Sequence, residues 1–78
     1  MATLRLFASV RVAAGTGRVD IDGATVGEVI DIACARFGPE FASLVQHCRV
    51  WCNGEAADLS APVTDRDEVA ILPPVSGG

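Results

Sequence analysis

Lysine is absent from this 78-residue chain, and its six cations are arginines scattered singly along it. The formal net charge is -4 at pH 7. No basic stripe is therefore available to follow a nucleic-acid backbone or an anionic membrane surface. Without lysine, the chain also offers no side chain for an isopeptide link on itself. We expect neither nucleic acid nor membrane as a partner, and the acidic balance favours a basic partner protein.

The chain also lacks an apolar run long enough to cross a bilayer and a recognisable secretion signal, because Arg5 and Arg11 interrupt its apolar start. Its three cysteines, Cys34, Cys48 and Cys52, are odd in number and lack the paired spacing of a zinc or iron–sulfur site. Cys34 is interpreted as a core thiol, and the roles of the other two stay open. We therefore expect a reduced, cytoplasmic domain that binds no metal and no cofactor.

The length allows one small domain. A domain of this size buries only about 60% of the surface that its unfolded chain exposes. Half of the residues are hydrophobic, so a core can form. A deep catalytic cleft does not fit such a small body, and a carrier or binding module is favoured over an enzyme that acts alone.

Two strands are predicted at the start of the chain. Residues 3–9 alternate in polarity, with Arg5 and Phe7 on one face. A glycine-bearing turn at 15–17 precedes a second alternating segment at 18–22. Two strands joined through such a loop predict a hairpin.

A helix follows. Thr25 and Glu28 have the spacing of a capping box, in which each residue satisfies a backbone amide near the helix start. Gly38 and Pro39 end the helix, and residues 41–45 predict a short further helical turn. The apolar stripe of the helix comprises Val26, Val29, Ile30, Ala33, Cys34 and Phe37.

Three strands are predicted in the second half, at 49–52, 55–59 and 69–72, with an Asn-Gly hairpin turn between the first two. The first and last strands of the chain can pair in parallel at the centre of a sheet, with the helix across one face. This order predicts an α+β fold of the β-grasp, or ubiquitin-like, kind. We expect the domain to span residues 1–74 and a flexible tail to span 75–78.

The end of the chain suggests a reaction at its own terminal carboxylate. Two terminal glycines carry no side chain and can approach another surface closely, while two prolines stiffen the root of the tail. An ATP-using partner could adenylate the terminal carboxylate, and a persulfide donor could then convert the adenylate to a thiocarboxylate. The residues concerned are Pro73, Pro74, Val75, Ser76, Gly77 and Gly78.

The segment 67–78, with its double proline and Val-Ser-Gly-Gly ending, resembles the C-terminal signature of the small subunit of molybdopterin synthase, the MoaD branch of the MoaD/ThiS sulfur carriers. The hairpin at 51–55 and an aromatic residue at Phe7 are similar to that family as well. The chain departs from the family pattern at Arg66, where glycine is frequent, and at Leu72, where an aromatic is common.

The resemblance implies a cycle. A MoeB-like activating enzyme uses ATP to adenylate Gly78, and a sulfur donor protein converts it to a thiocarboxylate. The tail then enters a MoaE-like large subunit of molybdopterin synthase, which makes this chain a sulfur-donating, non-catalytic subunit. Four alternatives stay open: a sulfur carrier for thiamine synthesis, one for cysteine synthesis, a ubiquitin-like protein modifier, and an interaction module with an inert tail.

Docking residues are predicted from strand parity and from the resemblance. Phe7 and Leu72 point away from the predicted helix, toward the face through which the family docks partners. Leu59 either extends this patch or joins the core, and Trp51 joins it only if the third strand is regular. The acidic turn before the last strand could meet arginines on the activating enzyme. The predicted partner contacts are Phe7, Leu59, Leu72, Asp65, Asp67 and Glu68.

Overall fold

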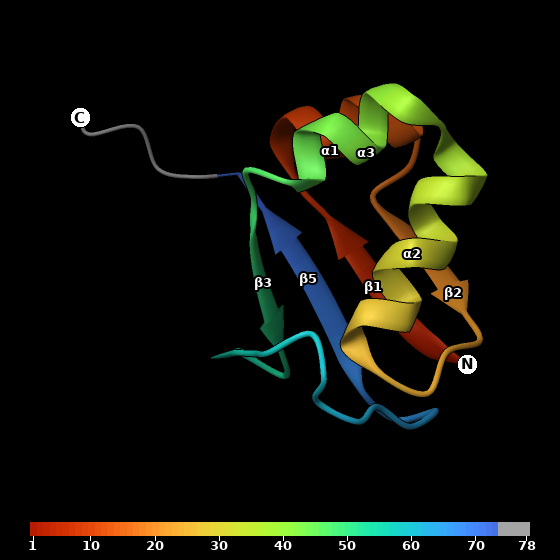
Figure 1. Cartoon of the computed structure of the whole chain (residues 1–78), viewed down its shortest axis with the longest axis vertical. Helices are drawn as coiled ribbons and strands as arrows, with labels where there is room; N and C mark the ends of the chain where they lie inside the picture. The colour runs from red at the N-terminus through yellow and green to blue at the C-terminus, as the bar shows by residue number, and fades with distance from the viewer. Residues whose placement is uncertain (74–78) are drawn as a thin grey trace.

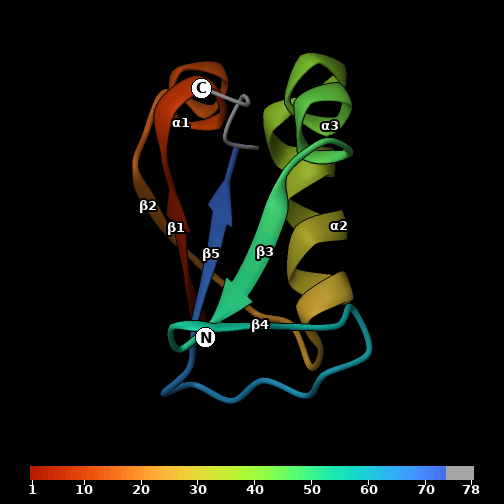
Figure 2. The same ribbon diagram turned by 90° about the vertical axis from the view of Figure 1, so that its left-hand side faces the viewer.

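A computed structural model describes residues 1–73 of the chain. Its strands form one mixed sheet in the order β2-β1-β5-β3-β4. The central strands β1 and β5 run parallel, and β1 is antiparallel to β2 while β3 is antiparallel to both β4 and β5 (Figure 2). The elements are β1 Ala2–Leu6, α1 Ala8–Ala14, β2 Arg18–Ile21, α2 Val26–Phe37, α3 Pro39–Val45, β3 Arg49–Cys52, β4 Glu55–Ala56 and β5 Glu68–Leu72.

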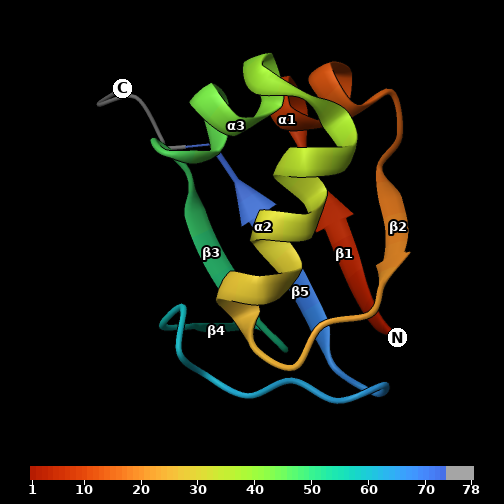
Figure 3. The ribbon, with the colours of Figure 1, turned by 45° about the vertical axis from the view of Figure 1, so that its right-hand side comes forward.

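Helix α2 crosses one face of the sheet (Figure 3). Helices α1 and α3 lie at the end of the sheet where β1 and β5 finish (Figure 1). This arrangement confirms the predicted β-grasp fold, with its central parallel pair and its helix across one face. None of the helices within residues 1–73 has both the length and the apolar character needed to span a membrane.

The core lies between the sheet and its helices. In β1 and β5, every second residue is buried, and the parallel register sets Leu4 beside Val69 and Leu6 beside Ile71. These four side chains are at most 1% exposed. The remaining buried apolar residues are Ala2, Val10, Ile21, Val26, Val29, Ile30, Ala33, Phe41 and Val63.

The predicted cap of α2 is present. The Glu28 amide donates to the Thr25 hydroxyl at 3.1 Å, and a Glu28 carboxylate oxygen accepts from the Ala24 amide at 3.4 Å, one residue before the cap. Gly38 ends the helix with φ 100°, and Pro39 starts α3, which confirms the predicted stop and the second helical segment.

The predicted hairpin at the start of the chain is wrong in its connection. The first strand ends at Leu6, and Ala8–Ala14 forms α1 before β2 begins. The chain turns at Ala8, which has φ 51°, and the helix ends at Gly15 with φ 77°. A seven-residue helix is unstable alone. Val10, which is fully buried, holds it against the core.

The predicted fourth strand is also too long, since β4 contains only Glu55–Ala56. Two carbonyls of the segment after β4, at the end of the predicted strand and just beyond it, instead accept hydrogen bonds from the start of α2. The Gly27 amide donates to Leu59 at 2.7 Å and the Val26 amide donates to Ala61 at 2.9 Å. The loop after β4 thus satisfies amides that no turn of helix could satisfy, because the first amides of any helix lack partners within it.

Candidate functional site

The sheet face turned away from α2 carries a groove of about 490 Å³. We call it the open-face groove, and its apolar lining comes from Phe7, Trp51, Ala70, Leu72 and Pro73. Strand alternation explains this lining, because the residues between the buried ones of β5 face outward. The structure therefore brings together the predicted contacts Phe7 and Leu72. Their role in binding a partner stays a prediction.

Trp51 belongs to the same groove. In the β3–β5 ladder Trp51 lies opposite Ala70, and Arg49 lies opposite Leu72. The ladder is regular, so Trp51 faces outward while Val50 faces the core. Sequence reasoning left Trp51 uncertain and missed Arg49, which lines the groove as well. Only the parity of β3 could have identified them.

The groove extends to the root of the predicted tail. Pro73 is partly exposed and lines it directly after the end of β5. Five further tail residues lie outside the described residues, so their predicted roles, including the reacting carboxylate of Gly78, stay predictions: Pro74, Val75, Ser76, Gly77 and Gly78. A partner that covers the open-face groove would contact the chain immediately before this segment.

Leu59 does not lie with the other predicted contacts. It is 60% exposed and lines a second groove, on the helix side of the sheet, together with Ile30 of α2 and Val45 of α3. Neither alternative for Leu59 holds as stated, because it is neither in the core nor in the open-face groove. A partner contact at Leu59 would belong to a different surface.

The predicted acidic contacts have partners within the chain. Asp65 accepts from the amino group of Met1 at 2.6 Å, although its side chain is 87% exposed. Glu68 lies 3.7 Å from the Arg5 guanidinium and lines the open-face groove. These two exposed ion pairs contribute little to folding, so both carboxylates could exchange their present partner for one on another protein.

Asp67 has a structural role in the turn. Its carboxylate accepts from the Asn53 side chain at 3.0 Å and from the Thr64 amide at 2.7 Å. The side-chain oxygen of Asn53 also accepts a hydrogen bond from the Glu68 amide at 2.9 Å. These hydrogen bonds, from Asn53 first and then from Thr64, lower the pKa of Asp67. The turn before β5 is thereby tied to the β3–β4 hairpin, and Asp67 is the least available of the three acids for a partner.

The three cysteines have environments that disfavour the thiolate form. All are free thiols and partly buried, and burial raises the pKa of each of them. A raised pKa reduces the thiolate fraction that nucleophilic chemistry requires. Cys48 donates to the Leu44 carbonyl at 3.1 Å. Among residues 1–73, no group of three or more histidine, cysteine or acidic side chains is placed to hold a metal ion.

Comparison with known proteins places these features in context. The model of the ThiS family matches residues 4–78. Small archaeal modifier protein 1 of Haloferax volcanii is 42% identical over 95% of this chain and 97% of its own length. Its crystal structure superposes with a TM-score of 0.82, at 40% identity over 99% of this chain and 98% of that one.

Two further solved structures are similar. A chain of the Amycolatopsis orientalis BexX/CysO complex is 32% identical, with a TM-score of 0.83 and full coverage of both chains. A candidate subunit 1 of molybdopterin converting factor from Pyrococcus furiosus is 25% identical, with a TM-score of 0.84 over 95% of this chain and 97% of that one. The similarity thus extends over the whole fold, and the similar proteins include a modifier protein, a chain of a CysO complex and a candidate molybdopterin converting factor subunit.

Proposed function

The chain belongs to the ThiS family of ubiquitin-like sulfur carriers, and on this premise we propose that it carries sulfur as a thiocarboxylate on Gly78 for molybdopterin synthase, as the small subunit of that enzyme. The observation that carries the proposal is the open-face groove, whose lining includes Pro73, four residues before the Gly-Gly ending in the sequence. A partner seated on this groove would be positioned to receive the tail. The catalytic groups would then belong to the partner.

The proposed chemistry has three steps. The Gly78 carboxylate attacks the α-phosphate of ATP on a MoeB-like activating enzyme, and pyrophosphate leaves. A persulfide on the sulfur donor protein attacks the acyl carbon of the adenylate, and AMP leaves. A thiol then cleaves the resulting acyl disulfide, so that the thiocarboxylate is released and the donor sulfur forms a disulfide with that thiol.

Two features of the chain support this division of labour. Burial raises the pKa of all three thiols, which disfavours nucleophilic chemistry by the cysteines of the chain itself. The glycines at 77 and 78 present only backbone, which allows entry into a narrow channel. A MoaE-like large subunit would supply the cavity in which sulfur reaches the pterin precursor. We place the cycle in the cytoplasm, where ATP is available and thiols stay reduced.

A protein modifier is the second candidate. The 42% identity to small archaeal modifier protein 1 favours it specifically. The same adenylate would then react with a lysine amine of a target, with loss of AMP and formation of an isopeptide bond. Because the chain has no lysine, it could not build branched chains on its own side chains. A carrier for another sulfur pathway differs from the first proposal only in its final partner.

The deciding experiment is to weigh the C-terminal fragment. The protein is expressed beside its native activating enzyme and sulfur donor and is cleaved after Arg66. The fragment 67–78 contains neither cysteine nor methionine, so oxidation of sulfur side chains cannot imitate the replacement of oxygen by sulfur. A chain lacking Gly78 is the control, because its fold is expected to be unchanged.

Each outcome selects one function. Sulfur on the fragment, followed by transfer to a pterin precursor when the large subunit is added, is the expected result. Sulfur without that transfer overturns the molybdopterin assignment in favour of another sulfur pathway. An unmodified fragment together with lysine-linked targets identifies a modifier. An unmodified fragment beside an active activating enzyme, without conjugates, overturns both proposals.

A further inference from the structure

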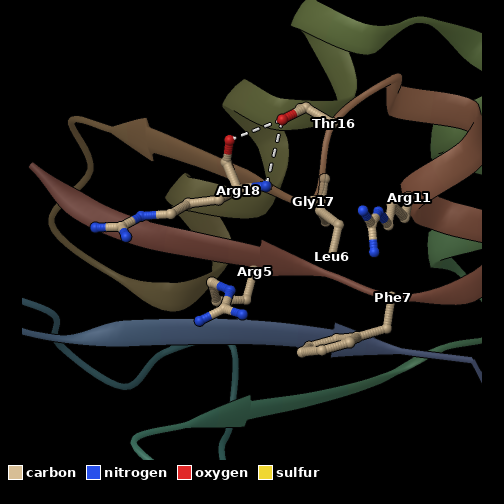
Figure 4. Close-up of a pocket in the computed structure, with 7 residues that line it drawn as sticks. All are labelled: Arg5, Leu6, Phe7, Arg11, Thr16, Gly17 and Arg18. Atoms are coloured by element: carbon tan, nitrogen blue, oxygen red, sulfur yellow. Dashed lines mark hydrogen bonds between the residues drawn. The ribbon is translucent and has the colours of Figure 1, made fainter.

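Three arginines line a hollow of about 360 Å³ beside Phe7. We call it the arginine hollow, and its arginines come from three different elements: Arg5 from β1, Arg11 from α1 and Arg18 from β2, whose side chain runs away from Arg11 (Figure 4). Phe7 lines both this hollow and the open-face groove. The two depressions are therefore adjacent parts of one surface.

Folding does not favour this gathering of charge. The β1–β2 register places Arg5 directly opposite Arg18, and like charges at directly opposed positions of an antiparallel pair are destabilising. Among residues 1–73, Arg5 is the only one of the three with an acidic partner, Glu68, at 3.7 Å. The arrangement thus has a cost that the described part of the chain offsets only in part.

The local geometry positions two of these arginines, Arg5 and Arg11. The Arg5 guanidinium carbon lies 5.8 Å from the centre of the Phe7 ring, and the buried Nε atom of Arg5 has no hydrogen-bond partner within the described residues. Arg11 packs so closely over Gly17 that a Cβ there would lie 3.2 Å from the Arg11 Nε. The hollow is therefore lined by donors whose capacity is not filled.

The charge of this surface is opposite in sign to that of the chain as a whole. The chain has ten acidic residues and six arginines. Four of the arginines, Arg5, Arg11, Arg18 and Arg49, line the arginine hollow or the open-face groove. Glu68 is the one acidic residue that the described part of the chain contributes to either lining. The combined lining of the arginine hollow and the open-face groove is thus positive on a protein whose net charge is -4.

We infer that the open face binds a protein partner whose surface carries carboxylates around an apolar anchor. The anchor fills the open-face groove, and aspartate or glutamate side chains of the partner pair separately with Arg11 in the arginine hollow and with Arg18 at its edge. Guanidinium groups bind carboxylates through two parallel hydrogen bonds, and complementary charge accelerates encounter. This inference rests on the proposed function, because the activating enzyme is the partner that must dock before adenylation. It reverses the expectation of a basic partner.

Charge reversal tests the inference. Arg11→Glu and Arg18→Glu are compared with Arg36→Glu, which makes the same change of charge on α2, outside both linings. The measurement is the KM and kcat of each protein as substrate for the native activating enzyme, from pyrophosphate release between low and high salt. We expect the two hollow variants to raise KM about tenfold at low salt with kcat unchanged, and to flatten the salt dependence. Arg36→Glu should stay within about twofold.

Thermal unfolding separates docking from folding. Arg18→Glu places an opposite charge across from Arg5, so this variant should be at least as stable as the original protein while its docking is impaired. Loss of stability in step with docking would overturn the inference, as would equal effects of Arg36→Glu.

A peptide titration tests the surface independently of adenylation. A synthetic peptide with phenylalanine between two glutamates is added to the isotope-labelled full chain, and a peptide with lysines in place of the glutamates is the control. We expect the backbone amide signals of Phe7, Arg11 and Arg18 to move only with the acidic peptide. Equal shifts with both peptides, or the same shifts with inorganic phosphate alone, would overturn docking of an acidic protein. If the protein is not adenylated but the titration is positive, the proposed function is wrong and the inference of an acidic partner for this surface stands.

Discussion

The two faces of the central strands differ in what covers them. On the helix side, Leu4 and Val69 are completely buried under α2. On the open side, Arg5 and Ala70 in the same strands are only partly buried, and Phe7, which directly follows β1, is 38% exposed. In β1 and β5, the inward-facing side chains therefore form part of the core, whereas the outward-facing side chains form a surface that a partner can reach.

This separation matters for a carrier that must meet several proteins. A change on the open face can alter recognition with little effect on the core, because alternate residues of a strand point to opposite sides. A domain of this size has little stability in reserve, so its docking residues cannot be the residues on which folding depends. The comparison makes three predictions, beginning with the largest effect.

Substitution on the covered face should unfold much of the protein. Leu4→Ala removes a side chain that is fully buried, and leaves a cavity between the sheet and α2. We expect a loss of about 2–5 kcal/mol in the free energy of unfolding, measured by urea denaturation. A loss below about 1 kcal/mol would mean that the core collapses around the change, against the close packing expected of it.

Substitution on the open face should leave the fold and weaken docking. Leu72→Ala shortens an anchor in the open-face groove. We expect a loss of about 1 kcal/mol or less in stability and at least about a tenfold loss of affinity for the activating enzyme, measured by calorimetry. Ile32→Ala is the matched control, because Ile32 is 37% exposed on α2, away from the groove. Equal affinity losses for both variants would break the distinction between the faces.

The smallest effect concerns the turn that leads into β5. Hydrogen bonds from Asn53 and Thr64 lower the pKa of Asp67 in the folded state. A lowered pKa adds stability at neutral pH, and this stability is lost as the pH falls below about 4 and through the folded value. Asp67→Asn should therefore reduce the dependence of the unfolding midpoint on pH in that acidic range. Asp58→Asn, the same substitution at an exposed position in the loop after β4, is the matched control. A similar reduction by both variants would contradict the role of the turn.

Local patterns correctly predicted the elements in which the spacing of apolar residues is clearly that of a helix or of a strand. The capping pair and apolar stripe identified α2, and the alternation in β1 and β5 identified which side chains are buried. The same alternation failed at α1, because the strand predicted at 3–9 extended past Leu6 into the start of this helix. Burial of Val10 against the core overrode that pattern. No glycine marked the turn at Ala8, where the backbone adopts a positive φ.

The sequence by itself determined the β-grasp order, the outward parity of Phe7 and Leu72, and the Gly-Gly ending, because these features depend on the order and spacing of residues along the chain. Only the tertiary structure decided that Trp51 joins the open-face groove, that Leu59 lies on the other side of the sheet, and that arginines from β1, α1 and β2 line one hollow. Strand register and the path of the loop after β4 bring such residues together or hold them apart. These depend on hydrogen bonds between segments that are distant in the chain, which no local spacing encodes.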